Sequence, residues 1–189
     1  MITDRKAPPA CQAAVVLVLE TLWLGQTVPA DAAPLDSLHW SISIVNAHEP
    51  GQRMIVTGRL FDSTGKTPRA GVRMGVYQTD ARGFYGATTL ASPVARLHGW
   101  LRTDSLGRYE IRTIRPGAYP GGGTPAHIHF IVGPPGRDSV LGELRFEDDP
   151  LIRTYERERW RSRGTFGEVR PVTRDRRGIL HVVRDFQRP

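Results

Sequence analysis

The stretch from residue 112 to residue 130, RTIRPGAYPGGGTPAHIHF, decides the fold class. It begins at the end of a β-rich run and contains Pro116, Gly117 and three consecutive glycines. It ends within the run HIHFIV at 127–132. Proline and glycine mark loops, whereas β-branched and aromatic runs of this length are typical of strands. We therefore expect two strands joined by a long loop.

Similar strand-like runs lie on both sides of this stretch, with turn signals between them. We expect strands over 38–47, 53–61, 72–78, 100–103, 107–114, 127–132, 141–146 and 178–186, and a short helix or turn within 149–161. The turn from Asp104 to Gly107 predicts a hairpin between two of these strands. Turn signals recur about every 8–12 residues, which is typical of an all-β sandwich or barrel.

The N-terminus has the features of a secretory leader. Arg5 and Lys6 precede the apolar run at 13–19, and an A-x-A pattern follows at 30–32. The apolar run is too short to span a bilayer as a helix. We expect a signal peptide over 1–33, a single domain over 34–189, and a secreted or periplasmic protein without a membrane segment in its mature form. Because Glu20 interrupts the leader, an amphipathic N-terminal helix of the mature protein is the alternative.

The positive charge does not predict a nucleic-acid partner. The formal net charge is +7, but Lys6 and Lys66 are the only lysines, and the arginines alternate with acidic residues. An aromatic-studded basic stripe, which single-strand binding uses, does not occur. A solvated arginine-rich surface explains this pattern, and attraction of a small anionic substrate is the alternative. Cys11 lies within the expected leader, so no disulfide framework is expected.

The motif His127-Ile128-His129 is the sharpest local feature. Residues two apart on a strand point to one face, so both imidazoles can reach one metal ion while Ile128 packs behind them. An HxH pair alone is weak evidence, but Tyr119 lies in the preceding loop and Tyr85 follows the turn at 80–83. A phenol with a pKa near 10 needs a strong Lewis acid to ionise at neutral pH. Two tyrosines and two histidines therefore indicate a ferric site better than a zinc site.

The segment from Gly71 to Phe130 resembles the intradiol ring-cleavage dioxygenases, most of all the protocatechuate 3,4-dioxygenase β-subunit branch. The resemblance rests on RTIRPGAYP at 112–120 and PAHIHF at 125–130, and it extends through 78–85, 101–104 and 146–151. These motifs occur in the family's order over about half of the chain.

The resemblance implies a β-sandwich of mainly antiparallel strands with long active-site loops. It implies one non-haem Fe(III) with Tyr85 and His127 as equatorial ligands, Tyr119 and His129 as axial ligands, and a hydroxide. Tyr119 would be displaced by a catechol-type aromatic substrate and would take up one of its protons. O2 would then cleave the ring between the two hydroxylated carbons to a muconate-type diacid. A homo-oligomer is compatible with the family, and the sequence does not fix the oligomeric state.

Three positions depart from the family pattern. The family usually has an arginine where this chain has Thr124, often a glutamine where it has Glu143, and a tryptophan where it has Gly121. The missing arginine would stabilise the oxygenated intermediate. The sequence offers three candidate replacements, namely Arg102, Arg112 and Arg115. These departures leave the natural catechol unassigned.

Two other function classes remain open from the sequence. One is a secreted β-sandwich binding module that retains the iron and catechol site without turnover. The other is a zinc hydrolase built on His127 and His129, whose nearest downstream acids are Asp138 and Glu143. The remaining histidines are expected at the surface or in packing, with His98 the one that could border the site; they are His39, His48, His98 and His181.

Overall fold

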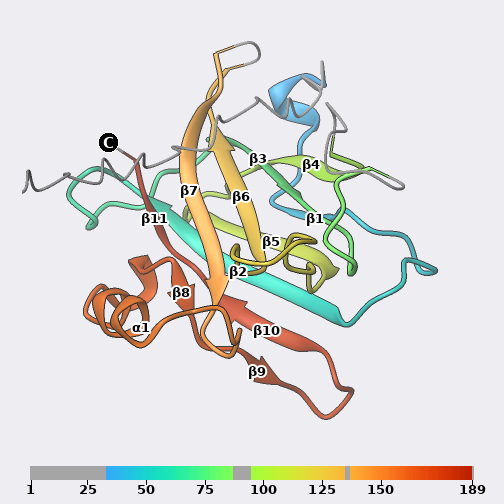
Figure 1. Cartoon of the computed structure of the whole chain (residues 1–189). Helices are drawn as coiled ribbons and strands as arrows, with labels where there is room; N and C mark the ends of the chain where they lie inside the picture. Colours follow the sequence, from blue (N-terminus) through green and yellow to red (C-terminus); the bar gives the residue numbers. More distant parts are fainter. Residues whose placement is uncertain (1–32, 87–94, 135–136, 189) are drawn as a thin grey trace, which may run out of the picture.

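Two β-sheets packed face to face form the body of the protein in this computed structural model, which describes residues 33–86, 95–134 and 137–188 (Figure 1). The expected leader at 1–33 falls almost wholly outside these residues, as does Cys11, so the leader stays a prediction. Within the described ranges, no helix is long and apolar enough to cross a membrane.

The first sheet has six strands in the order β1-β5-β2-β10-β9, with β11 also paired to β2. Its strands are β1 (Ser41–Ser43), β2 (Arg53–Phe61), β5 (Arg108–Ile114), β9 (Thr173–Arg174), β10 (Leu180–Val183) and β11 (Phe186–Gln187). The longest ladder joins β2 and β5 antiparallel, whereas β10 and β11 both run parallel to β2.

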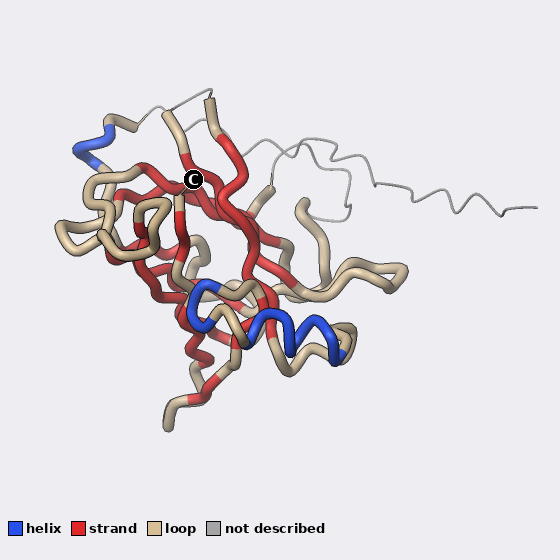
Figure 2. The backbone as a smooth tube through the Cα atoms, turned by 90° about the vertical axis from the view of Figure 1, so that its left-hand side faces the viewer, coloured by secondary structure: helices blue, strands red, loops and turns tan. Residues whose placement is uncertain are grey.

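The second sheet has five strands in the order β4-β3-β6-β7-β8. Its strands are β3 (Arg73–Gln78), β4 (Leu97–Arg102), β6 (His127–Val132), β7 (Ser139–Phe146) and β8 (Val169–Arg170). The helical segments η1 (Leu35–Ser37), α1 (Thr154–Arg161) and η2 (Gly164–Phe166) lie at the edges of the strand body (Figure 2).

The alternation of side chains along the second sheet separates the core from a second, outer face. Val76 on β3 and Phe130 on β6 are fully buried against the first sheet, where Phe130 lies 5.8 Å from the Tyr109 ring. Burying a side chain of this size contributes roughly 1.5–3 kcal/mol. Residues of the opposite parity, including Tyr77 and His129, point away from this core because successive strand residues face opposite sides. The outer face of the second sheet is therefore available for a functional site.

The sequence predicted the all-β class correctly, and β2 and β6 have the predicted bounds. The predicted hairpin at Asp104–Gly107 is wrong, because β4 pairs with β3 in one sheet and β5 pairs with β2 in the other. The turn itself forms, but it carries the chain from one sheet to the other. Most of the strand pairing is antiparallel, as predicted, although each sheet also contains parallel pairs. Strand β1 is shorter than the predicted strand at 38–47.

Candidate metal centre

A tight turn directly after β3 places Tyr85. The Asp80 carboxylate accepts hydrogen bonds from the backbone N–H groups of Arg82 (2.9 Å) and Phe84 (3.1 Å). Gly83 has φ of +89°, a left-handed conformation that glycine adopts without steric cost. The turn reverses the chain so that Tyr85, which is 3% exposed, lies over the outer face of the second sheet.

The loop that carries Tyr119 packs backbone to backbone on this turn. The Gly117 N–H donates to the Asp80 carbonyl at 2.8 Å, and the Thr79 hydroxyl donates to the Gly117 carbonyl at 2.9 Å. A Cβ atom at Gly117 would lie 2.6 Å from the Ala81 carbonyl oxygen, which is closer than real Cβ contacts. The absence of a side chain at Gly117 therefore lets the two tyrosine-bearing segments meet.

His127 and His129 occupy the outer face of β6, as the period of a strand predicts, while Ile128 is fully buried in the core behind them. The Nδ1–H of His127 donates to the Pro125 carbonyl at 2.7 Å. This bond assigns the proton to Nδ1 and leaves the Nε2 lone pair of His127 facing the two tyrosines.

The four predicted ligand residues come together in a closed ring of donor atoms. The phenol oxygens of Tyr85 and Tyr119 are 2.6 Å apart, and the Tyr119 oxygen lies 3.1 Å from His127 Nε2. His127 Nε2 lies 2.9 Å from His129 Nε2, which in turn lies 2.9 Å from the Tyr85 oxygen. Residues from two loops and one strand thus direct four nitrogen and oxygen atoms at a common point.

The protonation states of the ring atoms are set mainly by burial. Burial lowers the pKa of His129 to about 3, so its imidazole is neutral at physiological pH. Burial raises the pKa of Tyr85 far above its usual range, and it also raises the pKa of Tyr119. The hydrogen bond with Tyr85 partly offsets the rise that burial causes in the pKa of Tyr119. Tyr119 is therefore the easier of the two phenols to ionise.

This donor set fits a metal cation of high charge. Ligand atoms at about 2.0–2.1 Å from a first-row metal lie roughly 3 Å from one another, which is the spacing of the ring. The Nε2 atoms of His127 and His129 lie 2.9 Å apart, a spacing that two imidazole ligands of one cation also have. Two phenols with raised pKa values need a strong Lewis acid to ionise, which favours a trivalent ion over zinc. The residues present therefore fit a ferric ion.

Glu143 is a residue whose proximity the sequence did not reveal. It lies directly opposite His129 in the ladder between β6 and β7, and its Oε1 is 3.5 Å from His129 Nδ1. The two histidines and Glu143 thus form a group of metal-binding type. Because Glu143 faces the Nδ1 side of the ring, away from the Nε2 atom shared with the tyrosines, it contacts a ligand instead of completing the four-atom ring.

An apolar wall adjoins the four donor atoms. The Tyr77 ring stacks on His129 with 4.5 Å between ring centroids, and burial raises the pKa of Tyr77 to about 12. Tyr77, Tyr85, Ala95 and Trp100 form one buried cluster, against which Tyr119 also packs. The sequence did not single out Tyr77; the ladder between β3 and β6, which sets Tyr77 opposite His129, is the feature that brings it to the site.

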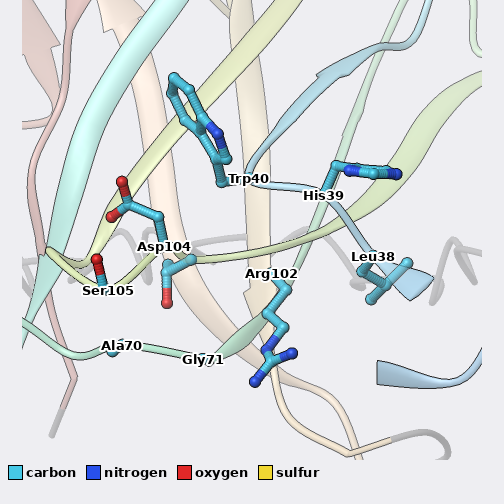
Figure 3. Close-up of a pocket in the computed structure, with 9 residues that line it drawn as sticks. Leu38, His39, Trp40, Ala70, Gly71, Arg102, Asp104 and Ser105 are labelled. Carbon is cyan, nitrogen blue, oxygen red and sulfur yellow. The ribbon is translucent and has the colours of Figure 1, made fainter. Parts of the chain in front are cut away.

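The three arginines suggested as replacements for the family arginine are engaged elsewhere. Arg112 pairs with Glu110 on β5, and Arg115 forms two hydrogen bonds to Asp148. Arg102 pairs with Asp36 and lines a separate groove of about 520 Å³ at the far end of β4, together with Trp40 and Asp104 (Figure 3). Arg145 is an arginine that does lie beside the site: it is opposite His127 in the ladder and donates a hydrogen bond to Glu143.

The other histidines largely follow the sequence expectations. His98 lies opposite Tyr77 in the ladder between β3 and β4, so it borders the apolar wall, and its Nδ1 contacts the Ala95 carbonyl at 2.6 Å. His181 belongs to the first sheet and pairs with Asp175. His39 lines the separate groove.

Comparisons with known proteins agree with this geometry. A family described as "Dioxygenase" matches residues 31–157. The protocatechuate 3,4-dioxygenase beta chain of Burkholderia cepacia is 34% identical over 133 residues, covering 65% of this chain and 56% of that protein. Catechol 1,2-dioxygenase 2 of Acinetobacter lwoffii is 31% identical over 120 residues, covering 55% and 43%. The chain therefore spans about half the length of the curated relatives it matches.

Solved structures show the same fold. The dioxygenase domain of a dioxygenase and carbohydrate-binding protein fusion from Streptomyces sp. SirexAA-E has a TM-score of 0.57 at 26% identity, covering 77% of this chain and 85% of that one. Catechol 1,2-dioxygenase from Acinetobacter sp. ADP1 has a TM-score of 0.58 at 21% identity, covering 78% and 56%.

Proposed function

This chain belongs to the intradiol ring-cleavage dioxygenase family, and we propose that it is itself a non-haem Fe(III) enzyme that cleaves a catechol-type ring with O2. The bond broken joins the two hydroxyl-bearing carbons, and both oxygen atoms enter a muconate-type diacid. The closed ring formed by Tyr85, Tyr119, His127 and His129 is the observation that carries the proposal.

These four residues would hold the iron. When bound, ferric iron supplies Lewis acidity that draws electron density out of a chelated catecholate. The protein contributes a pre-shaped set of donors, because His127 is fixed by Pro125 and Tyr85 is held by the turn that begins at Asp80.

Tyr119 is the residue suited to accept a substrate proton. It is half-buried, whereas Tyr85 is 3% exposed, so Tyr119 is the phenol that an entering diol can reach and displace. Its oxygen, once ionised, takes the proton of one substrate hydroxyl, while the 2.6 Å contact to Tyr85 keeps it beside the site.

The apolar wall would receive the aromatic ring. Tyr77 and Trp100 are each about 5% exposed or less and shield the outer face of the sheet from water. Aromatic substrates pack well against such side chains. The wall supports an aromatic ortho-diphenol as the substrate class and leaves the individual catechol open.

The deciding experiment combines colour, metal content and product analysis. Purified protein reconstituted with iron should be red-brown, contain about one iron per chain, and convert at least one member of a catechol, protocatechuate and hydroxyquinol panel. With ¹⁸O2, both labelled atoms should appear largely in the diacid. A yellow semialdehyde would contradict cleavage between the two hydroxylated carbons.

A binding module without turnover is the second candidate, and Thr124 favours it, because the family usually has an arginine there. Iron-loaded protein that changes colour with catechols but consumes no O2 would support this candidate. A protein that takes up no iron would exclude both candidates.

We also propose that the protein is exported. The support is the basic start, the apolar run at 13–19 and the A-x-A pattern at 30–32, which together have the order of a cleavable leader.

A further inference from the structure

A row of four side chains crosses the outer face of the second sheet. His98, Tyr77, His129 and Glu143 are successive partners on β4, β3, β6 and β7. Directly opposite side chains in such ladders are close enough to interact. The row therefore places the Glu143 carboxylate beside Nδ1 of the proposed metal ligand His129, on the edge of the imidazole that faces away from Tyr85 and Tyr119.

The two oxygens of Glu143 have different partners. Oε1 lies 3.5 Å from His129 Nδ1, whereas Oε2 accepts hydrogen bonds from Arg145 Nε at 3.0 Å and Nη2 at 2.8 Å. The side chain of Glu143 is 16% exposed, and that of Arg145 is 27% exposed. Arg145 thus fixes the rotamer of Glu143 and leaves Oε1 directed at the imidazole.

The charges make this arrangement stable as an ion pair. The Arg145 guanidinium lies 2.8 Å from the Glu143 carboxylate, so the two side chains form a salt bridge. The second contact of Arg145, to Glu156 at 3.5 Å, ties the pair to α1. Glu143 is therefore an anion that a neighbouring guanidinium holds in one position.

We propose that Glu143, held by Arg145, is a positioning residue for His129. The anionic oxygen keeps the proton of His129 on Nδ1, directs Nε2 at the four-atom ring, and strengthens the imidazole as an electron donor to a bound metal. A glutamine amide, which the family often has at this position, could accept the same proton but would lack the charge. This inference rests on the proposed iron site.

The test compares Glu143→Gln, Glu143→Leu and Arg145→Gln with the wild-type protein. The matched control is Glu147→Gln, because Glu147 follows directly after β7 and also pairs with an arginine, Arg161, instead of a histidine of the site. Removing the charge should weaken iron binding by about 10–100-fold, with the leucine variant weakest and the control unchanged. It should also move the visible charge-transfer band to longer wavelength, since a poorer imidazole donor leaves the iron more electron-deficient.

The metal-free protein gives a second measurement, independent of iron uptake. Long-range ¹H–¹⁵N NMR spectra should show His129 as the Nδ1–H tautomer in the wild-type and control proteins and as a mixture in Glu143→Leu. If Glu143→Leu keeps the iron affinity, band position and His129 tautomer of the wild-type protein, Glu143 does not position His129. That outcome would leave the proposed iron site intact. A wild-type protein that binds no iron would instead contradict the proposed function, and the tautomer would still decide the role of Glu143.

Discussion

The phenol oxygens of Tyr85 and Tyr119 lie 2.6 Å apart although 34 residues separate them in the chain. Neither tyrosine belongs to a strand; each follows a loop that is fixed by backbone contacts to the other. The meeting of these loops is therefore the structural step on which the site depends, and it can be tested without disturbing the ligands themselves.

Gly117→Ala should separate the two loops. The new methyl group would lie 2.6 Å from the Ala81 carbonyl oxygen, and overpacking of this kind costs roughly 1–3 kcal/mol. We expect a lower unfolding midpoint and weaker iron retention. Gly121→Ala is the control, because its Cβ would meet nothing within 4 Å; it strains only its own backbone and should keep the metal.

Asp80→Ala should loosen the turn before Tyr85. Loss of hydrogen bonds to a charged, buried acceptor costs on the order of 1.5–3 kcal/mol. The control is Asp104→Ala, which disrupts a similar turn in the segment that joins the two sheets. There the Asp104 carboxylate accepts hydrogen bonds from the backbone N–H groups of Leu106 and Arg108. Both variants should lose stability in denaturant titrations, but only Asp80→Ala should lose iron. Equal iron retention would show that the turn does not position Tyr85.

The Asp80 turn also predicts that the folded protein loses stability at low pH. Burial opposes ionisation of Asp80, but the Phe84 N–H and the Arg82 side chain outweigh it, so the pKa of Asp80 is lowered. The stabilisation is therefore complete above the unfolded pKa of about 3.9 and is lost as the pH falls through the lower folded pKa. Unfolding curves of metal-free Asp80→Asn protein should depend less on pH below about 4 than wild-type curves.

Iron uptake should release about two protons per chain from the two phenols, because both have raised pKa values and are neutral before binding. Apparent affinity should then rise with pH by up to about 100-fold per unit. Calorimetry in buffers of different ionisation enthalpy measures the release. Tyr85→Phe and Tyr119→Phe should each release one proton fewer, whereas Tyr77→Phe, whose ring only stacks on His129, should match the wild-type protein.

His127→Ala and His129→Ala should abolish iron retention, since each removes a nitrogen from the four-atom ring. His181→Ala is the control, because His181 pairs with Asp175 on the other sheet. Stoichiometric iron in the His127→Ala protein, measured by metal analysis after dialysis, would show that β6 does not anchor the metal.

Export should leave a mature N-terminus near Ala33. Sequencing of protein recovered from the extracytoplasmic fraction measures this directly. An intact Met1 or Ile2 there would count against cleavage.

The sequence predicts those parts of the site that depend on local geometry. The face shared by His127 and His129 follows from the period of a strand, and Ile128 packs behind them as expected. The contacts of Glu143 and Tyr77 depend on which strands pair and in which register, and local spacing does not encode that. The hairpin prediction was wrong for the same reason: Asp104–Gly107 specifies a reversal of direction but not the sheet that receives the next strand.

The pairing of β10 with β2 has a consequence for the order of folding during synthesis. Residues of β2 such as Met54 leave the ribosome long before their partner Leu180, so the first sheet stays incomplete while the chain grows. The strands β3, β4, β6 and β7 all lie within 73–146, and their ladders can close earlier. The four donor atoms would then come together on a nascent chain whose first sheet still exposes the unpaired edge of β2.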